Sequence, residues 1–237
     1  MIKVFGKTDT GLKREHNEDA IGWSDTDGLV VLADGMGGHN AGEVASYMAV
    51  TAIQQQLSKG PVDNPVEAIK NAIDNANRRI HQKAQESLIC AGMGTTVVVT
   101  LFDDEHVTFA HVGDSRLYLI RDGELKQLTS DHSLVQELVD EGFMNEAEAH
   151  ESVSNNVITR ALGTEPVVQV DIQQQQAYSG DCYLLCSDGL SDMIETTDIL
   201  NITGGESSLE QRVDNLVDLA NRHGGSDNIS AIVVDIL

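Results

Sequence analysis

The sequence predicts an α+β fold in which two antiparallel β-sheets pack face to face and helices flank them. Short β-branched segments bounded by Gly, Asp or Asn occur in two groups, and Asp-Gly pairs stand between neighbouring segments. Helical periodicity occurs in one pair of segments and in one isolated segment, rather than after every strand. This order of elements is typical of α+β domains, because a parallel sheet would require strands and helices in strict alternation.

The expected strands are short and rich in Val, Ile, Leu and Thr. The first group spans residues 2–8, 29–33, 95–102, 107–112 and 117–120, and the second spans 167–172, 182–186 and 229–236. Asp27-Gly28 and Asp122-Gly123 have the composition of tight hairpin turns, which predicts antiparallel pairing.

Three segments repeat apolar residues at helical spacing, and they predict helices over 41–57, 65–84 and 209–221. The apolar face of the first consists of Val44, Ala45, Met48, Ala49, Ala52 and Ile53. The third is followed by His223-Gly224-Gly225, a typical signal for the end of a helix.

The chain has 237 residues, 41% of them hydrophobic, and its three prolines mark no linker, so one domain over 1–237 is expected. Its formal charge of −23 comes from 38 acidic against 15 basic residues. A field of that sign repels nucleic acid and anionic membrane surfaces, which excludes them as expected partners. Metal ions or basic protein segments are the natural counter-ligands.

The cysteines favour neither a disulfide framework nor a zinc site. Cys90, Cys182 and Cys186 are odd in number and have no Cys-x-x-Cys spacing. The first residues lack the apolar core of a signal peptide, and no apolar run approaches the ~20 residues of a membrane-spanning helix. A cytoplasmic location and a monomeric state are therefore expected.

Two Asp-Gly pairs differ from the hairpin pairs, because each follows a long apolar run. Asp34-Gly35 ends the run 29–33, and Asp188-Gly189 follows the run 182–186. An isolated Asp-Gly is more often an ordinary turn. Further acidic signals change that balance: Gly113-Asp114-Ser115 separates two expected strands, and Asp227-Asn228 directly precedes the last one.

Aspartates without accompanying Cys or repeated His spacing predict a hard oxygen site suited to Mg²⁺ or Mn²⁺. Two such ions about 4 Å apart can share a carboxylate and a water molecule, which then loses a proton readily. Near the N-terminus, Arg14 precedes Asn17-Glu18-Asp19. Its planar guanidinium could bind a phosphate through two hydrogen bonds.

Together these residues resemble the metal-dependent protein phosphatases of type 2C, the PPM family, in their bacterial form. The motifs occur in the family's order: Arg14-x-x-Asn17-Glu18-Asp19, Asp34-Gly35-Met36-Gly37-Gly38, Gly94-Thr95-Thr96, Val112-Gly113-Asp114-Ser115-Arg116, Ser187-Asp188-Gly189-Leu190 and Asp227-Asn228. The resemblance implies a four-layer αββα fold, with a flap at about 134–166 beside the active site.

The resemblance also implies a role for each matching residue. Asp34 would bridge two Mn²⁺ or Mg²⁺ ions, the Gly35 carbonyl would bind one of them, and Asp188 and Asp227 would bind the other. Asp114 would form a weaker third site with Asp188. Waters on the ions would be held by Glu18 and Asp19, and the substrate phosphate would be held by Arg14.

The activity so implied is hydrolysis of phosphoserine or phosphothreonine in proteins, without a phosphoenzyme. The expected partners are phosphorylated substrates of a serine/threonine kinase, and the kinase itself. The alternative is a catalytically weak phosphoprotein-binding regulatory module of the same fold. Loss of a metal aspartate would indicate that module, but Asp34, Asp188 and Asp227 are all present.

One position departs from the family. Animal members carry a histidine two residues after the bridging aspartate, as a candidate general acid, and Met36 stands there in this chain. His39 is our hypothesis for a substitute, and a water on the metal is an equal rival. We assign no chemistry to His111, expected within a strand, or to His132, in what is expected to be a helix cap.

Three other classes of phosphate-binding protein require sequence features that this chain lacks. A cysteine phosphatase requires Arg six positions after its Cys, where Thr96, Asp188 and Asp192 stand instead. Asp25-Thr26-Asp27-Gly28 matches an aspartyl-nucleophile motif, but no apolar strand precedes it. The two glycine-rich stretches lack glycines that a nucleotide-binding loop needs, with Met1 and Asn40 at those positions.

Overall fold

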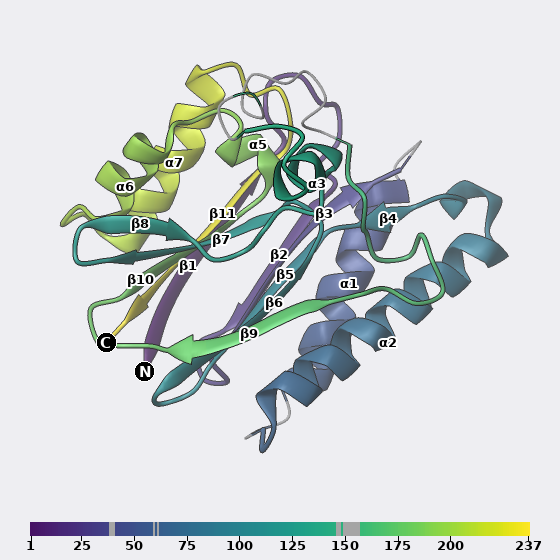
Figure 1. Cartoon of the computed structure of the whole chain (residues 1–237), viewed down its shortest axis with the longest axis horizontal. Coiled ribbons are helices and arrows are strands. Elements are labelled where there is room, and N and C mark those ends of the chain that lie inside the picture. The colour runs from purple at the N-terminus through teal and green to yellow at the C-terminus, as the bar shows by residue number, and fades with distance from the viewer. Residues whose placement is uncertain (38–40, 59, 61, 146–147, 149–156) are drawn as a thin grey trace.

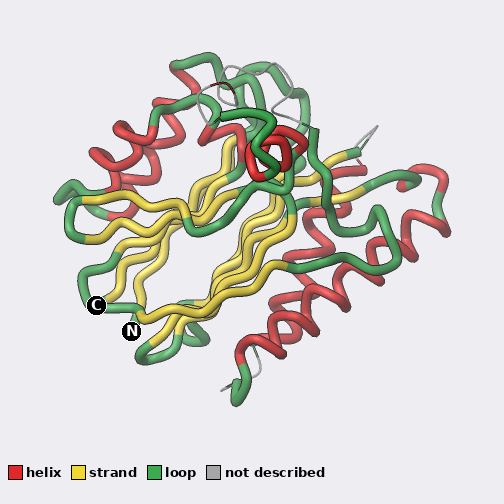
Figure 2. The backbone as a smooth tube through the Cα atoms, viewed as in Figure 1, coloured by secondary structure: helices red, strands yellow, loops and turns green. Residues whose placement is uncertain are grey.

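The computed structural model of the chain describes residues 1–37, 41–58, 60, 62–145, 148 and 157–237. Two antiparallel sheets pack against each other, and helices cover both outer faces (Figure 1, Figure 2). The predicted α+β sandwich is therefore confirmed.

The first sheet has the strand order β1-β11-β10-β7-β8. Its strands are β1 (Ile2–Asp9), β11 (Ile229–Ile236), β10 (Cys182–Cys186), β7 (Arg116–Arg121) and β8 (Glu124–Gln127). Every pairing is antiparallel, and β1 lies against β11 over its whole length, from Ile2 opposite Ile236 to Asp9 opposite Ile229. The first and last strands of the chain are thus neighbours, and the two termini lie at the same end of the sheet (Figure 1).

The second sheet has the order β2-β3-β5-β6-β9, and β4 adds to the end of β3. Its strands are β2 (Asp19–Ser24), β3 (Leu29–Met36), β4 (Gly94–Thr95), β5 (Val97–Phe102), β6 (His106–Val112) and β9 (Asp171–Gln176). Both predicted hairpin turns are found: Asp27-Gly28 joins β2 to β3, and Asp122-Gly123 joins β7 to β8.

Three apolar layers hold the domain together. Between the sheets lies a core that includes Val30, Leu117 and Tyr183. The helices α1 (Ala41–Leu57) and α2 (Pro65–Glu86) cover the second sheet, and α6 (Thr196–Thr203) and α7 (Leu209–Arg222) cover the first. The short helices α3 (Leu134–Asp140) and α5 (Asp188–Ser191) and the 3₁₀ turn Leu88–Cys90 complete the described elements.

The predicted helices are confirmed, with the ends of the second and third extended to Glu86 and Arg222. The strand predicted at 167–172 is wrong in position, because the strand is Asp171–Gln176. Its glutamines pair with β6 at the edge of the sheet, where polar side chains can reach solvent. The sequence analysis also missed β2, β8 and α6, of which β8 is a largely polar edge strand.

All three cysteines are free and buried in the structure. The helix cap predicted around His132 is confirmed one residue later. Ser133 caps α3, since its hydroxyl accepts a hydrogen bond from the Gln136 amide. None of the helices in the described part of the chain combines the length and the apolar character needed to cross a bilayer.

Candidate metal centre and active site

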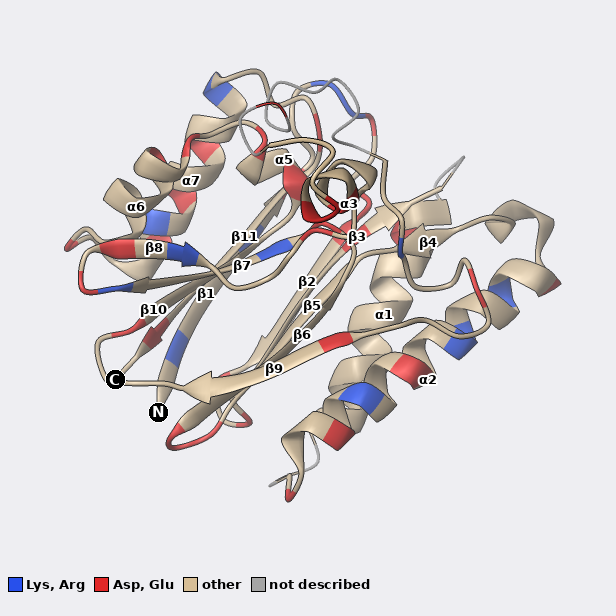
Figure 3. Ribbon diagram, in the orientation of Figure 1, with Lys and Arg blue, Asp and Glu red and all other residues tan. Residues whose placement is uncertain are grey.

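Five predicted aspartates lie at one end of the sandwich. Asp19 begins β2 and pairs in register with Asp34 near the end of β3. Asp114 lies in the turn between β6 and β7, Asp188 begins α5 directly beyond β10, and Asp227 immediately precedes β11. Antiparallel neighbours begin and end together, so residues far apart in the chain meet at this end. Figure 3 shows acidic segments gathered there, near the labels α5, α3 and β3.

Strand β3 extends further than the sequence indicated, and this places Asp34 inside the sheet. Gly35 and Met36 pair with Thr95 and Gly94 of β4. The Asp34 amide donates to Thr96 Oγ1 at 3.0 Å, and the Asp34 carbonyl accepts from the Thr96 amide at 2.8 Å. The backbone that carries Asp34 is therefore fixed before any ligand binds.

The carboxylates raise one another's pKa. Burial raises the pKa of Asp34 well above its usual range, and the negative charges of Asp19, Asp188 and Asp114 raise it further. Burial, then the charges of Asp114 and Asp192, have the same effect on the pKa of Asp188. Burial is also the main cause that raises the pKa of Asp19 and the pKa of Asp114, each to about 6.

Three oxygen atoms of this cluster are buried without a hydrogen-bond partner: Asp19 Oδ1, Asp114 Oδ1 and Asp188 Oδ1. The other oxygen of Asp19 is well satisfied, with Ser230 Oγ at 2.6 Å and Ser187 Oγ at 2.9 Å. A buried carboxylate oxygen without a donor is costly, and a hard divalent cation is the ligand that relieves it. The donor set therefore fits Mg²⁺ or Mn²⁺.

Gly35 and Gly42 let β3 and the first turn of α1 approach closely. A Cβ on Gly35 would lie 2.1 Å from the Gly42 carbonyl oxygen, and a Cβ on Gly42 would lie 2.8 Å from both Glu18 Oε1 and the Gly35 carbonyl oxygen. Glu18 is thereby held against the Gly35 backbone. Burial raises the pKa of Glu18, and a hydrogen bond from the Gly42 amide opposes that rise.

Arg14 reaches the edge of the acidic cluster. Its Nη2 lies 2.6 Å from Asp227 Oδ2, and its side chain is 49% exposed. The other Asp227 oxygen accepts from the Asn228 amide at 2.7 Å. Arg14 thus stands beside a predicted metal ligand, with much of its side chain still open to solvent.

The structure also shows contacts of polar residues to which the sequence analysis gave no role. Ser187 and Ser230 hold Asp19, and Thr96 links Asp34 to Ser115 through a hydroxyl contact of 2.7 Å. Asp192 adds negative charge near Asp114 and Asp188. Its position one helical turn after Asp188 could have indicated this, because residues four apart share a helix face.

Two positions, His39 and Met36, bear on the predicted proton donor. His39 lies outside the described residues, so its role as proton donor stays a prediction. Met36, which replaces the family's histidine, ends β3 half-buried.

The described residues contain one group of three whose ligand atoms all lie within 4.8 Å, and it is His111, His132 and Asp171. The carboxylate oxygens of the aspartate cluster do not all lie within that distance of one another, as expected of carboxylates that repel each other.

Comparisons with known proteins identify the family of the chain. The family model described as protein phosphatase 2C matches residues 12–232. Serine/threonine phosphatase stp of Listeria welshimeri is 39% identical over 236 residues, covering 97% of this chain and 94% of that protein.

Solved structures match over nearly the whole chain. The serine/threonine phosphatase PstP/Ppp of Mycobacterium tuberculosis has a TM-score of 0.94 and 38% identity, covering 99% of this chain and 98% of that one. The catalytic domain of PstP in complex with two manganese ions gives a TM-score of 0.91 and 38% identity, covering 99% and 97%. From its motifs, fold and relatives, this chain belongs to the protein phosphatase 2C family.

Proposed function

We propose that this chain is a metal-dependent serine/threonine phosphatase that removes phosphate from phosphorylated proteins by attack of water. The observation that carries the proposal is the cluster of aspartates at one end of the sandwich, with three buried oxygens that lack a partner. A divalent cation would compensate such carboxylates. The relatives named as serine/threonine phosphatases and the manganese-bound PstP domain support it.

The residues fit two divalent ions in the roles expected from the family. Asp34 and the Gly35 carbonyl would hold the first, and Asp34, Asp188 and Asp227 the second. Asp114 and Asp188, each with a free buried oxygen, would hold a weaker third. When bound, such ions lower the pKa of a water molecule and offset the charge of the phosphate group.

The chain's own residues would prepare that site. Asp19 is anchored through Oδ2 by two serine hydroxyls, so its free Oδ1 has a fixed position from which to accept a hydrogen bond from the water. Glu18, held beside Gly35, would act in the same way. Arg14 would donate two N–H groups to the phosphate oxygens in place of its present bond to Asp227.

The substrates that suit this surface are phosphoproteins with basic residues near the phosphorylated serine or threonine. The helix α3 begins the flap segment and lies near the active-site end of the sandwich (Figure 3). Glu137 and Asp140 in this helix, and Glu141 after it, are exposed. Negative potential there would favour cationic peptides. The kinase that makes these phosphoproteins is a further expected partner.

The test is phosphate release from a phosphothreonine peptide with Mn²⁺, with Mg²⁺ and with chelator, for the native chain and for Asp34→Asn. Activity with either ion, and none with chelator or with Asp34→Asn, is the expected result. Asp25→Asn is the matched control, because Asp25 is an exposed aspartate in the β2–β3 turn. A native chain that binds phosphopeptide without releasing phosphate would establish the regulatory module instead.

A further inference from the structure

His132 is a buried histidine that the proposed chemistry does not use, and it holds the backbone beside Asp114. The Gly113 amide donates to His132 Nδ1 at 3.1 Å, and the His132 amide donates to the Gly113 carbonyl at 3.0 Å. One residue therefore binds both polar groups of Gly113. Asp114 follows directly, and it is buried, with Oδ1 lacking a partner.

The protonation of His132 follows from these contacts. A ring nitrogen that accepts an N–H must carry a lone pair, so the proton of the neutral ring is on Nε2. Nε2 lies 3.5 Å from Asp171 Oδ2, which favours the same tautomer. Arg160 Nη1, 3.3 Å from Nε2, would favour a lone pair there, but the shorter contact of the Gly113 amide with Nδ1 decides for the proton on Nε2. Burial, then the neighbouring His111 and Arg160, lower the pKa of His132 to about 4, so the ring is neutral near pH 7.

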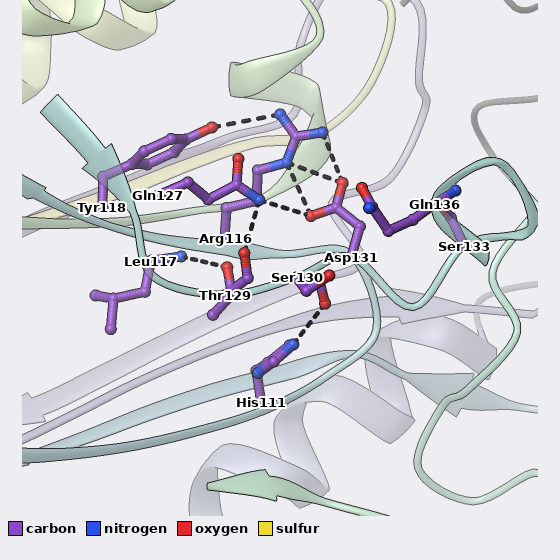
Figure 4. Close-up of polar contacts among 10 residues, drawn as sticks. All are labelled: His111, Arg116, Leu117, Tyr118, Gln127, Thr129, Ser130, Asp131, Ser133 and Gln136. Atoms are coloured by element: carbon purple, nitrogen blue, oxygen red, sulfur yellow. Dashed lines mark hydrogen bonds and ion pairs between the residues drawn. The ribbon is translucent and has the colours of Figure 1, made fainter. Parts of the chain in front are cut away.

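The segment that carries His132 is itself fixed. Figure 4 shows Arg116 and Asp131 joined by paired hydrogen bonds, with Nη2 at 2.6 Å and Nε at 3.0 Å from Oδ2. Thr129 Oγ1 accepts from the Leu117 amide at 3.1 Å, and the Ser130 carbonyl contacts His111 Nε2 at 2.7 Å (Figure 4). The turn at Gly113–Arg116 is thus bound at one end by His132 and at the other by Asp131.

Gly113 needs this support because its conformation is unusual. Its φ is +103°, which side chains rarely allow, and a Cβ there would lie 2.6 Å from Thr96 Cγ2. The turn directs Asp114 toward Asp188, whose pKa the charge of Asp114 raises more than any other residue's charge does. Two carboxylates that repel each other in this way would separate if the turn were free.

A metal site at His111, His132 and Asp171 is the obvious alternative, because their ligand atoms lie within 4.8 Å. Two contacts argue against it. His132 Nδ1 already accepts the Gly113 amide, so an ion at Nε2 would require the ring to lose its remaining proton. Arg160 Nη1 lies 3.3 Å from His132 Nε2 and 3.2 Å from Asp171 Oδ1, where a cation would meet a guanidinium.

We propose that His132 is a positioning residue, which holds the Gly113 turn so that Asp114 stays beside Asp188 and the two can share a divalent cation. The proposal rests on the proposed function for the identity of the ion. It adds to that function a residue outside the metal ligands, whose side chain acts through the hydrogen bond that it accepts from the Gly113 amide.

Two substitutions of similar polarity separate this role from simple filling of space. Asn places its oxygen as many bonds from Cα as Nδ1 of histidine, and Gln places its oxygen one bond further, in the manner of Nε2. His132→Asn can therefore accept the Gly113 amide, and His132→Gln cannot do so from the same position. Loss of a partner that orients a ligand costs about 10- to 100-fold in metal affinity or activity.

The experiment titrates Mn²⁺ and Mg²⁺ into each folded variant by calorimetry and measures phosphate release against metal concentration. His132→Gln should lose the weakest binding step, as Asp114→Asn should, and it should need about tenfold more metal for half-maximal activity. His132→Asn should behave like the native chain. Equal binding by the native chain and His132→Gln, or equal defects in the Asn and Gln variants, would overturn the proposal.

A measurement on the native chain covers the case in which His132→Gln does not fold. Nitrogen-15 spectra of the histidine rings should show His132 with Nδ1 unprotonated and hydrogen on Nε2 at pH 7. A proton on Nδ1 would contradict the inferred hydrogen bond. Failure of the native chain to release phosphate with any metal would refute the proposed function instead, and the calorimetry and ring spectra would still decide the role of His132.

Discussion

The two ends of the sandwich differ in whether their buried aspartates are paired with arginine. At the end away from the acidic cluster, Arg121 holds Asp181 through Nε at 2.7 Å and Nη2 at 2.6 Å, and the buried Arg212 pairs with Asp235. At the functional end, Asp19, Asp34, Asp114 and Asp188 form no ion pair with any other described residue. Compensated acids serve stability, and uncompensated ones mark the place where a cation binds.

The volume of a pocket alone does not identify the functional site. A pocket of about 510 Å³ lies at the compensated end, and its lining includes Arg121, Asp181, Arg212 and Asp235. Arg121 is paired with Asp181 and Arg212 with Asp235, so the charge of each of these two arginines is already compensated by a carboxylate. Charge that lacks a partner is the more informative signal.

The largest expected effect comes from Asp34→Asn at the functional end. Phosphate release should fall by more than the roughly 100-fold that loss of an outer partner of a metal site costs. The metal-free chain should become more stable, because a buried and repelling charge is removed. Thermal melts in chelator and turnover in Mn²⁺ measure the two effects, and a loss of both stability and activity would contradict the contrast between the ends.

Asp235→Asn at the other end should lower stability without affecting metal binding. It leaves Arg212 buried without its counter-charge, and breaking a buried pair costs about 3 kcal/mol or more of unfolding free energy. Metal affinity and KM should stay unchanged, since Asp235 stands at the opposite end of β11 from Asp227. Urea unfolding with a parallel Mn²⁺ titration would measure this, and weakened metal binding would count against the separation of roles.

Arg14→Lys should have a smaller effect, raising KM for a phosphopeptide about tenfold with little change in kcat. Lysine keeps the positive charge beside Asp227 but cannot form the paired hydrogen bonds of a guanidinium. Initial rates over a range of peptide concentrations separate the two constants. Lys13→Arg, at the preceding exposed position, is the control and should leave KM unaltered. A fall in kcat at constant KM would assign Arg14 a different role.

The smallest expected effect is a dependence of metal-free stability on pH. The pKa values of Asp19 and Asp114 are raised to about 6 in the folded chain, above the value of about 3.9 in an unfolded one. Their contribution to stability is therefore complete below about pH 4 and is lost as the pH rises through about 6. In chelator, the melting temperature should fall by about 3 °C or more between pH 5 and 7.5.

Saturating Mn²⁺ should remove most of that pH dependence above pH 6, because the bound ions favour the charged carboxylates. Asp114→Asn should reduce it without metal, since one of the groups with a raised pKa no longer titrates. A metal-free melting temperature that rises steadily from pH 5 to 7.5 would show that these aspartates are better compensated than the structure indicates.

The sequence by itself predicted the sandwich, the main helices and the aspartates that are the candidate metal ligands. Apolar periodicity decided α1, α2 and α7, since it depends only on which side chains avoid water. The matching motifs indicated Asp34, Asp188 and Asp227 because chemistry of that kind needs carboxylates at strand ends, whatever the surrounding chain.

Tertiary structure alone decided the elements and contacts that depend on residues distant in the sequence. The edge strand β8 has little apolar signal and exists because β7 offers a pairing partner. Likewise, the bond from the Gly113 amide to His132 joins residues 19 positions apart. Local sequence records the preference of each segment for helix, strand or turn, but a buried polar contact depends on which segments the packed sheets bring together.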